Sequence, residues 1–190
     1  MGVVVTIVDA SDWVGRNAAR TRIGELYMSS VTDMVANVLA FLSSYTRTPT
    51  PNSLIIHAMS QGRVPIPAPA APGTTRMSKL NVLDHGSHHG LQIGTDRLNT
   101  TTFARFRPEL ARLAPKFETD GYAHLQHCWL GANIPLMEMF ADTFGVPVVA
   151  GQNRTLPVLR LNLGSYTRVY PARGGSRQAS ETFFWGPPDQ

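Results

Sequence analysis

Two residues at the ends of apolar runs could act together as a nucleophile and its base. Cys128 is the single cysteine in the chain and ends a largely apolar run at residues 122–128. His85 follows a second such run at 77–83 and precedes Gly86. A thiol is nucleophilic as its thiolate, and an imidazole beside it can take the thiol proton and later protonate a leaving amine. This chemistry requires His85 and Cys128 to lie side by side.

Neighbouring parallel strands would meet that requirement, because their carboxyl ends lie at one edge of a sheet. Apolar, β-rich segments predict strands at 2–9, 53–59, 77–83, 122–128 and 146–151. Apolar residues spaced by three and four predict helices at 24–44, 103–117 and 132–144. Strands alternating with helices predict an α/β fold, with a mostly parallel sheet and helices on both faces. A C-terminal β-hairpin is expected from residues 156–163 and 166–170, and a short strand from 91–93.

The composition is that of a globular domain. The chain has 190 residues, of which 43% are hydrophobic, enough to bury a core. The net charge of +4 comes from 17 basic and 13 acidic residues without a basic block, which favours solubility over nucleic-acid binding. No run approaches the length of a membrane span, and residues 2–8 indicate a first strand rather than a signal peptide.

We expect one domain at residues 1–175 and a C-terminal tail at 176–190. A proline-rich loop at 62–75 is interpreted either as a surface excursion or as a flap or cleavable segment near the site. The localisation stays open. One cysteine excludes an internal disulfide and fits a reducing compartment, but an enzyme with a free catalytic thiol that is secreted or injected by a non-classical route has the same pattern.

The residues around the candidate pair suggest further roles. The N–H groups of Gly86 and Cys128 together predict an oxyanion hole, because a residue without a side chain lets its backbone approach the substrate. Trp129 is interpreted as a wall of the cleft or as a core aromatic residue. For Cys128 itself the alternative is a structural role, since free cysteine is among the most buried residue types.

The two segments resemble the motifs of the caspase-like cysteine peptidases of clan CD. Residues 82–87, Val-Leu-Asp-His-Gly-Ser, are followed by Leu-Gln-Ile-Gly and resemble the His-Gly motif of that clan. Residues 123–131 resemble its second motif, a hydrophobic strand that ends in the nucleophilic cysteine. Together with Gly-Val-Pro-Val at 145–148, the pattern is most similar to bacterial DUF4347 and CHAT-like domains.

The resemblance implies a caspase-like three-layer sandwich and a cysteine endopeptidase with Cys128 as nucleophile and His85 as base. It implies a protein or peptide substrate, and it points to bacterial effectors, toxins or parts of larger secreted proteins. No cofactor and no metal ion are expected. Asp9, at the end of the first strand, is a candidate to line the specificity pocket, or alternatively a turn cap. His127 departs from the small residue that the family usually has before the cysteine.

Two other functions stay open. The first is a catalytically silent caspase-like module that binds a peptide or partner. The second is a metal-dependent hydrolase that uses histidines near the site, which are His88, His89, His124 and His127. Their spacing matches no established zinc motif.

Overall fold

The computed structural model describes residues 2–9, 26–45, 75–156, 161–162 and 164–184. Seven strands form the main sheet, and these are β1 (Val3–Asp9), β2 (Leu26–Met28), β3 (Met77–Leu83), β7 (Phe117–Gln126), β8 (Val148–Gly151), β11 (Tyr166–Val169) and β12 (Glu181–Phe183). The smaller strands are β4 (Gly86–Ser87), β5 (Gly90–Ile93), β6 (Asp96–Leu98), β9 (Thr155–Leu156) and β10 (Leu161–Asn162). The helices are α2 (Val31–Ser44), α4 (Phe103–Ala111) and α5 (Ile134–Phe144), with short 3-10 turns η1 (Ala114–Lys116) and η2 (Leu130–Ala132).

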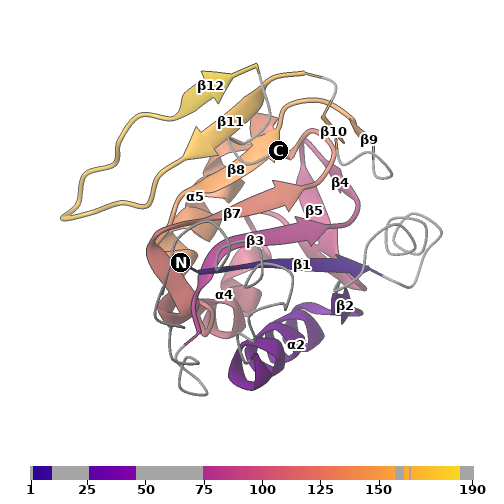
Figure 1. Ribbon diagram of the computed structural model, residues 1–190. Helices are drawn as coiled ribbons and strands as arrows, with labels where there is room; N and C mark the ends of the chain where they lie inside the picture. The colour runs from indigo at the N-terminus through magenta and orange to yellow at the C-terminus, as the bar shows by residue number, and fades with distance from the viewer. Residues whose placement is uncertain (1, 10–25, 46–74, 157–160, 163, 185–190) are drawn as a thin grey trace, which may run out of the picture.

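The main sheet has the order β12-β11-β8-β7-β3-β1-β2 (Figure 1). The pairs β1–β2, β1–β3, β3–β7 and β7–β8 are parallel, whereas β11 is antiparallel to both β8 and β12. The predicted α/β class and mostly parallel sheet are therefore confirmed. The carboxyl ends of β1, β3 and β7 point the same way, toward the small β4-β5-β6 sheet (Figure 1).

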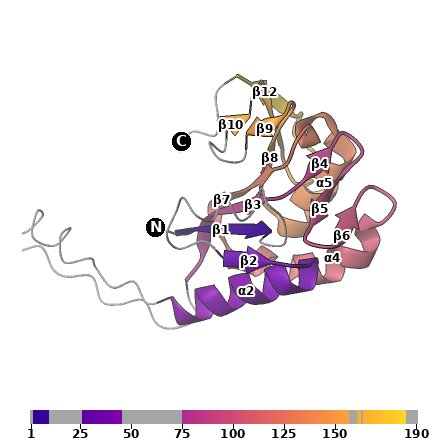
Figure 2. The ribbon, with the colours of Figure 1, turned by 90° about the vertical axis from the view of Figure 1, so that its right-hand side faces the viewer.

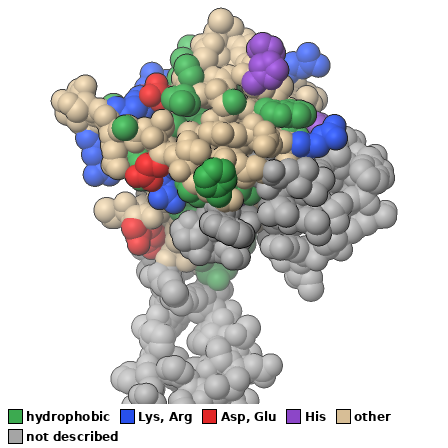
Figure 3. Space-filling model, turned by 90° about the horizontal axis from the view of Figure 1, so that it is seen from above, with side chains coloured by type: hydrophobic (Ala, Val, Ile, Leu, Met, Phe, Trp, Pro, Cys, Tyr) green, Lys and Arg blue, Asp and Glu red, His purple; other side chains and the backbone are tan. Residues whose placement is uncertain are grey.

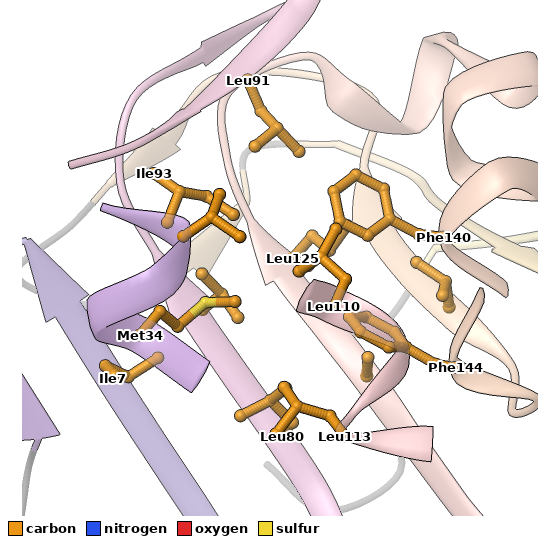
Figure 4. Packing of buried hydrophobic residues seen from close by; sticks show 14 of the residues in the cluster. Ile7, Met34, Leu80, Leu91, Ile93, Leu110, Leu113, Leu125, Phe140 and Phe144 are labelled. Carbon is orange, nitrogen blue, oxygen red and sulfur yellow. The ribbon is translucent and has the colours of Figure 1, made fainter. Parts of the chain in front are cut away.

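The three described helices lie on one face of the main sheet (Figure 2). Alternate residues of the strands face them, so that Leu80, Ala123 and Leu125 share one apolar core with the helices. Figure 4 shows Phe140 and Phe144 of α5 beside Leu125 in this core. The Phe140 ring also meets the Phe103 ring edge-on at 4.8 Å. The described part of the chain places no helix on the opposite face, so the second helical layer stays a prediction.

Polar residues occupy that opposite face of the central strands and are nevertheless buried. The Asn81 Nδ2 donates to the Thr6 hydroxyl at 3.2 Å, and the Gln126 Nε2 lies 3.3 Å from the His124 Nδ1. Asn81, His124 and Gln126 are all at most 6% exposed. The two faces of one sheet therefore differ in chemistry, with apolar packing on the helical side and hydrogen-bonded polar side chains beside a small apolar pair, Val8 and Leu83, on the other.

Several element boundaries differ from the predictions. The helix expected from residue 24 begins at Val31, because Ser30 caps it by accepting the Asp33 N–H, and residues 26–28 form β2 instead. The helix expected at 103–117 ends at Ala111, and β7 already begins at Phe117. The predicted strand at 53–59 and nearly all of the proline-rich loop lie outside the described residues.

The predicted C-terminal hairpin of 156–163 with 166–170 is not the pairing observed. β9 pairs with β10, whereas β11 joins the main sheet between β8 and β12. Residues 181–183, expected in the tail, add the edge strand β12 to the sheet. The ring of Phe183 stacks on that of Tyr166 at 5.8 Å, which explains why this segment docks.

Candidate active site

The register of β3 and β7 brings the two candidate residues level with each other. Leu83 is paired with Gln126 at the last step of this parallel ladder. His85 and Cys128 each lie two residues beyond the end of their strand, at the same edge of the sheet. His85 is exposed and Cys128 is half-buried, so the edge is open to a ligand.

Close contact at Gly86 confirms that the two segments meet. A Cβ built on Gly86 would lie 2.6 Å from the Cβ of His127, 3.0 Å from the carbonyl oxygen of Cys128 and 3.3 Å from its nitrogen. Any side chain here would push the two segments apart. Glycine therefore allows the His85-Gly86 step to pack directly against the backbone of Cys128.

The small sheet sets the direction of the Gly86 N–H. The Gln92 N–H donates to the His85 carbonyl at 2.9 Å, so His85 and Gln92 form a hydrogen-bonded pair. Such pairs alternate along an antiparallel ladder, which makes Gly86 and Leu91 a non-hydrogen-bonded pair. The Gly86 N–H thus points away from β5, and it belongs to the residue that packs against Cys128. This arrangement suits the expected pair of oxyanion donors.

Asp84 fastens the backbone that carries His85. Its carboxylate accepts the N–H of His85 at 2.6 Å and the N–H of Gly94 at 2.8 Å. Burial raises the pKa of this carboxyl from 3.8 to about 7, although the two N–H groups lower it. The Asp9 carboxylate raises it further, and His85 lowers it. Both of these bonds go to backbone N–H groups, so they hold the chain on either side of the small sheet rather than the His85 imidazole.

The chain turns sharply after Cys128. Trp129 adopts φ 57° and ψ 6°, the left-handed conformation that costs an L-residue about 1–2 kcal/mol. Its N–H donates to the Asn153 carbonyl at 2.9 Å, which holds the turn in place. The Trp129 side chain is 38% exposed, so it is not a core aromatic residue. Strained backbone of this kind is enriched at functional sites.

The comparisons with known proteins assign no family. No family model matches the chain, and no curated protein matches it in sequence.

Asp9 lies at the same edge but not beside Cys128. It ends β1, is 1% exposed and acts electrostatically on Asp84. Because β3 stands between β1 and β7, Asp9 is two strands away from the cysteine. The structure thus brings His85, Gly86, Cys128 and Trp129 together, with Asp9 at the next position along the edge. Its expected role in a specificity pocket stays a prediction.

His124 in β7 and His127, the residue before Cys128, are both buried within the fold. His127 is fully buried, and its Nε2 lies 3.1 Å from the Gln92 carbonyl oxygen. Burial lowers its pKa to about 4. Burial, with Lys79 nearby, lowers the pKa of His124 to about 3. Both imidazoles are therefore neutral at pH 7, and His127 contacts the backbone of β5.

Metal binding finds no support at this edge. Within the described ranges, no group of three or more His, Cys, Asp or Glu side chains is placed to hold a metal ion. The rings of His88 and His89 lie 4.0 Å apart on the β4–β5 turn, and both residues are exposed.

No helix in the described part of the chain is long and apolar enough to cross a membrane.

Three contributions to the site were not predicted from the sequence. Asp84 holds His85 through its backbone, Gln92 joins β5 to both His85 and His127, and Asn153 holds the turn at Trp129. Asn133 caps α5, and its Nδ2 also donates to the His88 carbonyl at 3.0 Å. Apart from the bond between the neighbours Asp84 and His85, these interactions join segments that are separated in the chain. A short polar residue next to a motif is the only local signal for them.

Proposed function

We propose that the protein is a cysteine peptidase of the caspase-like type, with Cys128 as nucleophile and His85 as base. The observation that carries the proposal is the packing of Gly86 against the backbone of Cys128. It puts a histidine, a thiol and two backbone N–H groups at the open carboxyl edge of a parallel sheet. Nucleophilic hydrolysis of an acyl bond needs these groups together.

The proposed reaction has two halves, which are the formation of a thioester and its hydrolysis. His85 takes the thiol proton as the sulfur of Cys128 attacks the peptide carbonyl. The N–H groups of Gly86 and Cys128 then hold the oxyanion of the tetrahedral intermediate. The C–N bond breaks as His85 returns the proton to the leaving amine, which leaves a thioester. Water, deprotonated by His85, hydrolyses the thioester and regenerates the thiol.

Trp129 supports the same proposal from the other side of the nucleophile. Its left-handed conformation and its N–H bond to the Asn153 carbonyl fix a tight turn directly after Cys128, which lies two residues beyond the end of β7. The exposed indole stands at the edge of the site, where it can contact the substrate chain.

The test compares the wild type with Cys128→Ala, His85→Ala and the control His88→Ala. Cleavage of a proteome-derived peptide mixture is measured by mass spectrometry. Loss of the nucleophile or of its base should reduce cleavage at least a thousand-fold, as in other hydrolases with a catalytic pair. His88→Ala removes an exposed histidine from the same turn and should cleave like the wild type.

Alkylation of the thiol gives a second readout that needs no substrate. Because the chain has one cysteine, iodoacetamide labels Cys128 alone. The proposal expects faster labelling than for a free peptide thiol at pH 7, and slower labelling after His85→Ala. Equal cleavage by all four proteins would refute the dyad. A slow thiol without cleavage would favour the peptide-binding module.

A further inference from the structure

A pocket of about 360 Å³ opens beside His85 on the small β4-β5-β6 sheet. Its border includes His85, Gly86, His89, Gln92 and Arg97. Cys128 is not among the described residues that border it. A hollow of similar size, about 390 Å³, lies near the start of β7, far from this chemistry.

Three of the bordering side chains stand in one row across the small sheet. His85 is hydrogen-bonded to Gln92, and Gln92 is the register partner of Arg97. Directly opposed residues on neighbouring strands project from the same face. Since strands lie about 4.8 Å apart, the backbone of Arg97 is about 10 Å from that of His85. That distance corresponds to about three residues of an extended peptide.

The charge on this face is positive. Arg97 is exposed and forms no ion pair with another described residue, and no Asp or Glu of the described ranges borders the pocket. The neighbouring Asp96 lies on the opposite face of β6, where its carboxylate accepts the Val31 N–H at 2.9 Å. In the view of Figure 3, the visible histidine side chains lie close to basic ones, and the visible acidic side chains gather elsewhere on the described surface.

The proton transfers in the proposed reaction indicate which part of the substrate lies beside His85. The group that protonates the leaving amine must face it, so the leaving segment of the substrate passes His85. The pocket borders His85 but not the nucleophile, and it is therefore on the leaving-group side. We infer that this pocket binds an acidic side chain, Asp or Glu, within the first three residues after the scissile bond. Arg97 is the specificity-determining residue. The inference rests on the proposed peptidase function.

The test maps the residues that follow each cleaved bond. A proteome-derived peptide library is digested with the wild type, Arg97→Gln or Arg97→Glu, and the new amino termini are sequenced. The matched control is Arg76→Gln, which removes an exposed arginine at the start of β3, the far end of that strand from His85. Synthetic peptides that differ only by Glu or Gln at the enriched position then give kcat/KM ratios.

The wild type and Arg76→Gln should prefer Glu over Gln by about two- to five-fold, the range expected for one exposed ion pair. Arg97→Gln should cleave both peptides equally well, and Arg97→Glu should reverse the preference toward basic residues. Cleavage that depends on Cys128 but shows no acidic preference, or an unchanged preference in Arg97→Gln, would overturn the pocket assignment alone. No cleavage dependent on Cys128 would overturn both the function and the assignment.

Discussion

Gly86→Ala is the most direct test of the geometry proposed for the site. Gly86 has a backbone conformation that alanine can adopt, so the new methyl group acts only through its contacts. It would lie 2.6 Å from the Cβ of His127 and 3.3 Å from the Cys128 nitrogen, well inside normal contact distance. Relieving these overlaps moves two segments apart by several tenths of an ångström. We expect the free energy of unfolding to fall by about 1–3 kcal/mol, the usual cost of overpacking.

Activity should fall by much more than this destabilisation alone would cause. Misplacing one oxyanion donor costs about 10²–10³ in kcat, and the methyl group pushes on both proposed donors. Cleavage of a peptide identified in the library digest gives kcat, and iodoacetamide labelling reports the environment of the thiol independently. Urea denaturation gives the stability of the same preparations.

Gly145→Ala is the matched control. Gly145 ends α5 at φ +70°, and a Cβ there would touch nothing within 4 Å. The positive φ should cost alanine about 1–2 kcal/mol, similar to the cost at Gly86, yet the site is untouched. The reasoning is refuted if Gly86→Ala cleaves like the wild type, or if Gly145→Ala loses activity to the same degree.

Three further predictions concern groups that support the site. Asp84 has its pKa raised from 3.8 to about 7, so the folded state holds this proton more tightly, and its contribution to stability is lost as pH rises from about 4 to 7. The difference in unfolding free energy between wild type and Asp84→Asn should shift over that window by on the order of 4 kcal/mol against the wild type, and a flat difference would contradict the burial of the carboxyl. His124 has its pKa lowered from 6.5 to about 3, so its neutral form stabilises the fold and this stability is lost as pH falls below 6.5. His124→Gln should therefore lose less stability than the wild type on acidification from pH 7 to 4, as urea titrations at each pH will measure. Asn133→Ala removes the cap of α5 and the bond to the His88 carbonyl, and should lower the free energy of unfolding by about 1 kcal/mol, whereas an unchanged urea midpoint would show that the cap is not needed.

The spacing of apolar residues and the residues that begin and end helices were sufficient to predict the elements that position the site. The apolar runs at β3 and β7 and the helix between them predict a parallel pair, and a parallel pair brings its carboxyl ends together. The caps of α5 were also local signals, with Asn133 before the first turn and Gly145 after the last. These local signals explain why the sequence alone predicts His85 and Cys128 at one edge of the sheet.

The remaining differences come from contacts that no local pattern contains. Residues 26–28 fit the apolar spacing of the next helix, but pairing with β1 draws them into the sheet as β2. β11 resembles one half of a hairpin with residues 156–163, but it pairs with β8 and β12 instead. In the sequence Asp84 is only the residue before His85. The fold shows that its carboxylate accepts the N–H of Gly94, ten residues away. Tertiary pairing decides each of these cases.

The parallel pairing of β3 with β7 also affects the kinetics of folding. His85 and Cys128 follow strands that are separated by the small sheet and α4, so the proposed dyad cannot form before a long loop has closed. Contacts between residues far apart in the chain form slowly, and parallel sheets are rich in them. A newly synthesised chain therefore passes through states in which the thiol has no base beside it. In a refolding experiment, the labelling rate of Cys128 should reach its native value only after the sheet is complete.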